Sequence, residues 1–237
     1  MTRRKTKPPG VELGKIHLGD CEDVALKMPP GSVDTIFTDP PYIKELWENA
    51  YGKLYRIAAH TLKPSGYLIT YCPQTHLSEI MDILRWGNAC GIPVGGPPKL
   101  EYFWEISSLN ISQSTAMNHQ RGAICLHKPI LVFQKPPMKR PQKCFTDVVR
   151  GKRQKSYHPW QQSIHDVLSV ISRFMTPGQV LLDPFAGSGT SLIAGKLLGM
   201  QWIGCELNPE THAIACQRME QQAIDLSAFA QEEEATA

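Results

Sequence analysis

Apolar residues recur at helical spacing and in short runs along the second half of the chain. Residues 164–175 place apolar side chains three and four positions apart, which predicts an amphipathic helix. The elements expected after it are a turn at 176–178, a strand at 179–183, a helix at 190–198, a strand at 201–205 and a helix from residue 209. Strands that alternate with helices in this way favour a mostly parallel sheet with helices on both faces.

The first half shows the same alternation, interrupted by proline and glycine. An apolar strand at residues 32–37 must end at Pro40 and Pro41, because proline donates no hydrogen bond to a sheet. The elements expected after it are a helix at 43–61, a strand at 67–71, a helix at 77–86, a loop at 91–98 and strands at 100–106 and 130–134. The complete pattern predicts an α/β fold of the Rossmann type.

Composition narrows the class of protein. The 237 residues are 42% apolar and 20% charged, which is typical of a globular chain with one substantial core. The apolar runs stop far short of the roughly 18 residues that a membrane-spanning helix needs, so we expect no membrane partner. The seven cysteines are scattered without a C-x-x-C pair, which argues against a disulfide framework and a zinc site. We therefore expect a soluble cytoplasmic protein with reduced thiols and no metal.

Positive charge is concentrated in one segment. The net charge is only +3, yet residues 135–155 hold eight basic residues and one acidic residue, so this window carries +7 and the rest carries −4. A basic, proline-containing segment on a mildly acidic body is typical of a surface that follows phosphates, although a solvated linker would look similar. The candidate residues for binding the phosphates of a nucleic acid in this window are Lys139, Arg140, Lys143, Arg150, Lys152, Arg153 and Lys155.

A glycine-rich turn at residues 183–190 lies between a buried strand and a helix. Gly187 and Gly189 allow a sharp bend and a close approach of the backbone to a ligand. Glu206, at the end of the next strand, is placed like the acidic residue that binds ribose hydroxyls in nucleoside-binding folds. Leu192 replaces the third glycine of a dinucleotide motif, so a nucleoside without a pyrophosphate fits better. A tight turn that binds nothing is the alternative.

A second turn, Asp-Pro-Pro-Tyr at residues 39–42, follows a predicted strand. Its two prolines remove two N–H donors, which leaves carbonyl oxygens and the Asp39 carboxylate as acceptors. Such a turn suits a planar amino group that donates one hydrogen to Asp39 and the other to the Pro40 carbonyl. Tyr42 offers a flat face on which a heterocycle can stack. A stiff turn whose aspartate caps the next helix is the alternative.

Together the two turns resemble those of the S-adenosylmethionine-dependent DNA amino-methyltransferases, which make N6-methyladenine or N4-methylcytosine. The catalytic turn precedes the glycine turn, as in the permuted beta class of this family. Further resemblance lies in residues 16–21, in residues 62–67, in residues 127–133, which look like a late edge strand, and in residues 158–163. The resemblance implies the class I methyltransferase fold in its permuted form, as a single catalytic domain over 1–237 with a small basic target-recognition region at about 86–157.

The resemblance also implies a role for each site residue and a set of partners. The catalytic residues would be Asp39, Pro40, Pro41 and Tyr42. S-adenosyl-L-methionine would be held by Asp20, Cys21, Asp183, Phe185, Ala186, Gly187, Ser188, Gly189, Thr190, Glu206 and Asn208, together with His158 and Gln161. The partner is DNA, to which the family adds a homodimer and a cognate restriction endonuclease, in the cytoplasm of a prokaryote or in a phage-infected cell.

Several acceptors of the methyl group are compatible with the sequence. Adenine N6 is expected first, because the turn begins with aspartate, whereas the cytosine enzymes more often begin with serine. Cytosine N4 satisfies the same two acceptors. An RNA or protein amine, and a DNA-binding protein without catalysis on the same scaffold, are the remaining alternatives.

Overall fold

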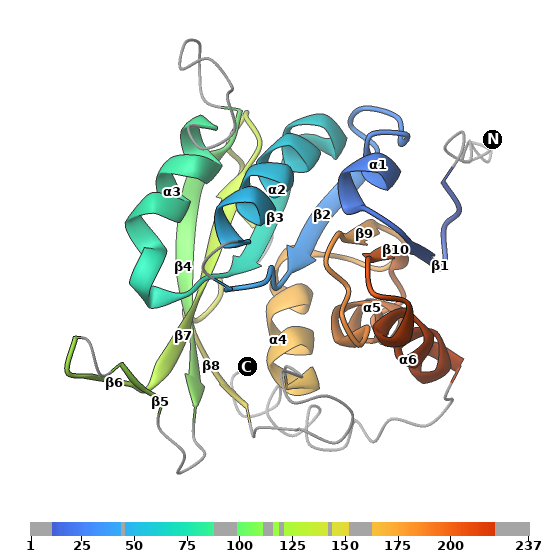
Figure 1. Cartoon of the computed structure of the whole chain (residues 1–237). Helices are drawn as coiled ribbons and strands as arrows, with labels where there is room; N and C mark the ends of the chain where they lie inside the picture. Colours follow the sequence, from blue (N-terminus) through green and yellow to red (C-terminus); the bar gives the residue numbers. More distant parts are fainter. Residues whose placement is uncertain are drawn as a thin grey trace.

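A mixed sheet of eight strands forms the centre of the computed structural model (Figure 1). The structure describes residues 11–43, 46–87, 99–110, 116–118, 121–141, 144–151 and 163–220. In spatial order the strands are β1 (Lys15–Leu18), β10 (Gln201–Glu206), β9 (Val180–Asp183), β2 (Val33–Thr38), β3 (Leu62–Tyr71), β7 (His127–Gln134), β4 (Glu101–Asn110) and β8 (Val148–Gly151). In this sheet β7 alone runs against the other strands. The predicted α/β class with a mostly parallel sheet is confirmed.

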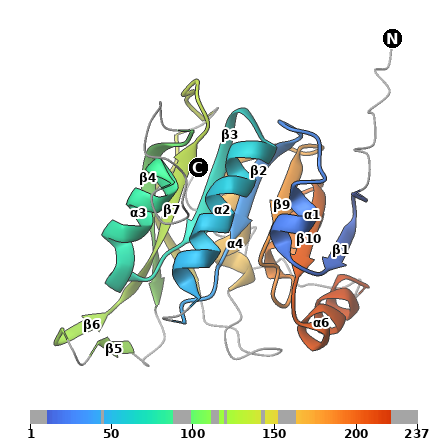
Figure 2. The same cartoon turned by 45° about the horizontal axis from the view of Figure 1, so that its top comes forward.

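Helices cover both faces of the sheet. One face carries α1 (Cys21–Ala25), α2 (Trp47–Thr61) and α3 (Leu77–Trp86), which follows a short 3-10 helix, η1 (Gln74–His76). The other face carries α4 (Ile164–Phe174), α5 (Thr190–Leu197) and α6 (Pro209–Glu220). In Figure 2 the first group lies in front of the sheet and α4 lies behind it. Successive side chains of β2 point to opposite faces of the sheet, so Ile36 packs with the first group of helices and Phe37 packs with the second.

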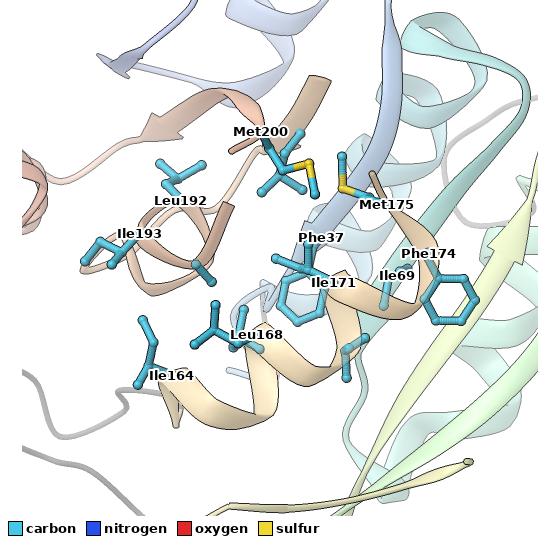
Figure 3. Packing of buried hydrophobic residues seen from close by; sticks show 14 of the residues in the cluster. Phe37, Ile69, Ile164, Leu168, Ile171, Phe174, Met175, Leu192, Ile193 and Met200 are labelled. Carbon is cyan, nitrogen blue, oxygen red and sulfur yellow. The ribbon is translucent and has the colours of Figure 1, made fainter. Parts of the chain in front are cut away.

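Helix α4 shows how the apolar pattern becomes packing. Its buried residues Ile164, Leu168 and Ile171 recur at positions i, i+4 and i+7, so they lie on one face of the helix. Figure 3 shows this face directed towards Leu192 and Ile193 of α5 and towards the sheet. Burial of each such side chain stabilises the fold by about 1.5 to 3 kcal/mol. The contact of α4 with α5 holds the segment that carries the glycine-rich turn.

Two predicted boundaries differ from the structure. Helix α2 begins at Trp47 instead of Ile43, because the chain first makes a turn in which Leu46 and Trp47 donate backbone hydrogen bonds to the Ile43 carbonyl. Strand β3 begins at Leu62 instead of Tyr67. The strand includes the Pro-Ser-Gly sequence at 64–66 because its pairing with β2 is irregular at this point. Ser65 there adopts a positive φ of 64°.

The expectation that residues 127–133 form an edge strand is wrong. Strand β7 pairs with β3 on one side and with β4 on the other. Its residues 130–134 are all buried, which suits a strand with neighbours on both sides. The predicted recognition range 86–157 thus supplies β4, β7 and β8 to the main sheet. Within that range, a small hairpin of β5 (Ala116–Asn118) and β6 (Ala123–Cys125) projects beyond the ends of β4 and β7 (Figure 1).

The connections around β2 and β9 create a crevice. These strands are parallel neighbours, with Ile36 paired to Leu182. The chain leaves β2 towards α2 on one face and leaves β9 towards α5 on the other. Open α/β sheets bind ligands at such a point, beyond the carboxyl ends of the strands. The site should therefore lie where β2 and β9 end.

Candidate active site

The two predicted turns face one cavity of about 700 Å³. Asp39 directly follows β2, and Asp183 is the last residue of β9, so pairing of these strands joins motifs that lie 144 residues apart in the sequence. All four residues of the Asp-Pro-Pro-Tyr turn line the cavity. So do nine of the predicted cofactor residues, namely Asp20, Cys21, Asp183, Phe185, Ala186, Gly187, Ser188, Thr190 and Glu206. The volume is that of a small-molecule site.

A buried hydrogen bond connects the two turns. Thr38, the residue before Asp39, donates its hydroxyl to Oδ1 of Asp183 over 2.6 Å. The same carboxylate accepts the backbone N–H of Phe185 over 3.0 Å and the hydroxyl of Ser191. Burial raises the pKa of Asp183 to about 6, although the hydrogen bonds from Ser191, Thr38 and Phe185 act to lower it. Asp183 therefore organises the backbone of the cavity from within the core.

The raised pKa of Asp183 makes stability depend on pH. Because the folded-state pKa of about 6 exceeds the ordinary value of 3.8, the cost of ionising Asp183 in the folded protein builds up between about pH 4 and pH 6 and is nearly complete above pH 6. Relative to Asp183→Asn, the wild-type protein should gain about 2 kcal/mol in free energy of unfolding as the pH falls from 7 to 4. Urea unfolding of both proteins across this range measures the difference, and parallel pH profiles would contradict it.

The glycine-rich turn contacts the Glu206 carboxylate through a backbone N–H group. Gly187 and Gly189 have φ angles of 52° and 82°, in the left-handed region that favours glycine. Gly187 donates its backbone N–H to Oε2 of Glu206 over 2.9 Å, while Oε1 of Glu206 accepts the N–H of Asn208 over 2.8 Å. A Cβ at Gly187 would meet no atom within 4 Å, so the space above the turn is open. Glu206 thus stands at the boundary between the turn and the cavity.

Lys128 of β7 contacts the Asp-Pro-Pro-Tyr turn from the neighbouring part of the sheet. Its Nζ lies 2.8 and 3.0 Å from the two carboxylate oxygens of Asp39. It also lies 4.6 Å from the ring centre of Tyr42 and 4.4 Å from that of Tyr71. Tyr42 in turn donates its hydroxyl to Asp39. The carboxylate that the sequence marked as an amine acceptor is therefore bound to an ammonium group here.

The model of the N6 and N4 DNA methylase family matches residues 33–217 of the chain, a range that contains both turns. The chain belongs to this family. Membership confirms the methyltransferase class and S-adenosylmethionine as the cofactor, and it favours DNA over the RNA and protein acceptors.

Curated relatives of this DNA methylase have low sequence identity to it, but they match over most of its length. The Escherichia coli K12 protein YubD is 26% identical over 218 residues, which cover 85% of this chain and 88% of that protein. Type II methyltransferase M.BamHI of Bacillus amyloliquefaciens is 28% identical over 235 residues, covering 83% of this chain and 55% of that protein.

Solved structures show the same fold. The complex of M1.HpyAVI with S-adenosylmethionine superimposes with a TM-score of 0.66 at 23% identity, over 87% of this chain and 99% of that one. The cytosine-N4-specific PvuII DNA methyltransferase gives a TM-score of 0.69 at 15% identity, over 93% and 91% of the two chains.

The basic candidates that the structure describes lie at two opposite edges of the sheet. Strand β7 ends at the edge of the sheet opposite Asp39, and the carbonyl of Lys139 there accepts the Tyr67 hydroxyl. Lys139 and Arg140 are therefore not brought to the catalytic edge, because β7 runs against its neighbours. Arg150 pairs with Leu109 at the end of β4 and does lie at that edge. Lys143, Lys152, Arg153 and Lys155 fall outside the described residues, as do His158 and Gln161.

Two other predicted cofactor residues are peripheral to the cavity. Asn208 accepts the N–H groups of Glu210 and Thr211, and so caps α6. Gly189 starts α5 and approaches Ala215 of α6, where an added Cβ would lie 3.4 Å from the alanine Cβ. Both residues shape the elements that surround the cavity.

Sequence reasoning missed Arg218, a buried residue of α6. Its guanidinium donates to the carbonyl and the hydroxyl of Ser188 and, over 3.2 Å, to the hydroxyl of Thr190. These acceptors form the last part of the glycine-rich turn. The contact depends on how α6 packs against α5, so the sequence pattern around Arg218 offered no signal for it.

Replacing Arg218 should weaken the cofactor site. Arg218→Lys keeps one charge on a shorter side chain but removes Nη1, the atom that donates to all three of these acceptors, so the turn loses hydrogen bonds that are assisted by charge. We expect the affinity for S-adenosylmethionine to fall about tenfold, as measured by calorimetry. Lys196→Arg, on the neighbouring helix α5, is the control. Unchanged affinity in Arg218→Lys would show that the turn holds its shape without the guanidinium group.

Among the residues described, none of the helices combines the length and the hydrophobicity that crossing a bilayer requires.

Proposed function

We propose that this chain is a site-specific DNA methyltransferase that transfers a methyl group from S-adenosylmethionine to the N6 amine of adenine. The observation that carries the proposal is the placement of Asp39 and the glycine-rich turn on one cavity, on adjacent parallel strands. One turn suits a nucleoside cofactor and the other suits an amine.

The cofactor fits the residues that line the cavity. We assign Asp183, Phe185, Gly187 and Thr190 to the methionine part, Glu206 to the ribose hydroxyls, and Asp20 and Cys21 to the neighbourhood of the adenine. The open space above Gly187 and the Glu206 carboxylate beside it support this assignment. Bound S-adenosylmethionine supplies a methyl group on a positively charged sulfur.

The protein's own contribution is to hold and polarise the target amine. Asp39 and the Pro40 carbonyl accept the two amine hydrogens and fix the direction of the nitrogen lone pair. Positive charge grows on the amine as the new N–C bond forms, and a fixed carboxylate stabilises this charge more than it stabilises the neutral amine. Since an amine inside a duplex cannot reach the cavity, the base must be flipped out, at a cost of a few kcal/mol.

DNA should approach the edge of the sheet at which Asp39 lies. Arg150 and the β5–β6 hairpin both lie at this edge, where Ile124 of the hairpin and Leu126, which directly follows β6, have exposed side chains. The basic residues at 152–155 follow Arg150 directly in the sequence. We assign target recognition to this part of the range 86–157. A cytoplasmic location, a homodimer and a cognate endonuclease stay predictions of the resemblance.

Nucleoside analysis tests the proposal directly. The purified protein is incubated with unmethylated plasmid and S-adenosylmethionine, and the digested DNA is separated by mass spectrometry. We expect N6-methyldeoxyadenosine. N4-methyldeoxycytidine would keep the mechanism and change the base, whereas no methylated nucleoside from a protein that binds the cofactor would favour the non-catalytic alternative.

A further inference from the structure

The catalytic turn contains a complete site for a cationic amine, and in the free protein Lys128 fills it. We propose that the Lys128 ammonium holds the place of the target amine, so that the flipped base must displace it from Asp39 before methyl transfer. Lys128 is then a specificity-determining residue of the substrate site. This inference rests on the proposed function and deepens it.

The contacts of Lys128 are those of a built site. The ammonium lies within 3.0 Å of both Asp39 oxygens and within 4.6 Å of the ring centres of Tyr42 and Tyr71. One carboxylate and two aromatic faces are what a desolvated cation prefers. Only 29% of the lysine side chain and 24% of the aspartate side chain are exposed, so this pair differs from a solvated surface ion pair.

The fold directs Lys128 to this position. Because β7 runs against β3, its first residues lie at the edge where β3 ends and where Asp39 follows β2. Lys128 comes second in β7 and lines the same cavity as the two turns. Burial lowers the pKa of Lys128, while the Asp39 carboxylate opposes this effect by favouring the charged form. The ammonium therefore depends on Asp39 for its stability in the cavity.

The ammonium and the target amine compete for the same acceptor. Asp39 is useful to the reaction only if its charge faces the nitrogen that becomes positive, and a bound ammonium neutralises that charge. Both Asp39 oxygens are within hydrogen-bonding distance of Nζ, so an arriving amine has to replace at least one of these contacts. A base without an amine at this point cannot replace it, so the exchange selects for amine-bearing bases.

Lys128→Met tests the competition, because methionine keeps an unbranched stem against the two rings and removes the charge. We expect the variant to bind duplexes with the target base more tightly, by about tenfold relative to duplexes with an abasic target. The KM for DNA should fall, with no loss in kcat. A 2-aminopurine at the target position should become more fluorescent in the variant complex, since more of the base is flipped out.

Lys63→Met is the matched control. Lys63 forms another lysine–aspartate pair, with Asp34 of the neighbouring strand β2, and it lies at the start of β3, away from the cavity. Its replacement removes the same charge and should change neither the discrimination nor the fluorescence. A fall of a hundredfold or more in kcat for Lys128→Met, with cofactor affinity intact, would overturn the proposal, because Lys128 would then act on the bound base. Equal discrimination in variant and wild type would also overturn it.

A second variant tests the same site without relying on how a methionine side chain packs there. Lys128→Ala leaves a gap beside Asp39, and ethylammonium should fill it and inhibit methylation competitively with DNA. Tetramethylammonium, which has the same charge but no N–H donor, should not. Equal effects of the two cations in Lys128→Ala, or equal inhibition by ethylammonium of wild type and variant, would count against a built site. If the wild type methylates no DNA, the proposed function fails; if it does and these tests fail, only the role of Lys128 falls.

Discussion

Asp39→Asn should lower the rate of methyl transfer by on the order of a hundredfold to a thousandfold, the usual effect of losing one preorganised electrostatic group. Asparagine nearly preserves the shape of the side chain and can still accept one hydrogen from the amine. It cannot supply the negative charge that stabilises a nitrogen becoming positive. The loss should appear in kcat more than in KM for DNA, because the charge acts mainly in the transition state. Single-turnover methylation with saturating cofactor measures it.

The control for this prediction is Asp82→Asn, on the exposed surface of α3. It removes the same charge from the protein and should leave the rate unchanged. Affinity for S-adenosylmethionine should stay within about twofold of wild type in both variants, since Asp39 contacts the acceptor side of the cavity. Full activity of Asp39→Asn would rule out the proposed role of the carboxylate.

Glu206→Ala should lower the affinity for S-adenosylmethionine by about a hundredfold, which corresponds to about 3 kcal/mol. Two losses combine to produce this fall in affinity. A ribose with two hydroxyls loses an ionised acceptor, and such hydrogen bonds contribute about 1.5 to 3 kcal/mol each. The backbone N–H of Gly187 also loses its partner, so the turn loses one of the contacts that hold it against β10. Calorimetry with S-adenosylmethionine and with S-adenosylhomocysteine measures the change.

Glu210→Ala is the matched control for Glu206. It removes a carboxylate from the same segment, but Glu210 is exposed in the first turn of α6. Its affinity for the cofactor should equal that of the wild type. A Glu206→Ala protein that binds the cofactor normally would show that the ribose is held elsewhere.

The sequence predicted those parts of the fold that repeat over many residues. Helix α4 was foreseen because its apolar residues recur over three turns of the helix. Strands β1 and β8 have only four residues each, and β1 buries only one of them. These short strands form because a neighbouring strand pairs with them. Four residues hold too little of an apolar pattern to predict this pairing.

The residues of the candidate site also differ in whether the sequence could predict them. Asp39, Asp183 and Glu206 could be found because each follows or ends a predicted strand, and the ends of parallel strands share one edge. Lys128 and Arg218 could not, since their partners lie 89 and about 30 residues away and are reached through strand order and helix packing. Their own surroundings in the sequence look like an ordinary strand and an ordinary helix.

The hydrogen bond from Thr38 to Asp183 has a consequence for how the two ligands bind. It places one direct contact between the turn to which we assign the base and the turn to which we assign the cofactor. A shift of either turn on binding is felt by the other, so occupation of the two subsites is thermodynamically linked. Linkage is reciprocal: whatever factor the cofactor adds to the affinity for the flipped base, the base adds to the affinity for the cofactor. The side chain of one threonine thereby couples the occupation of the two subsites.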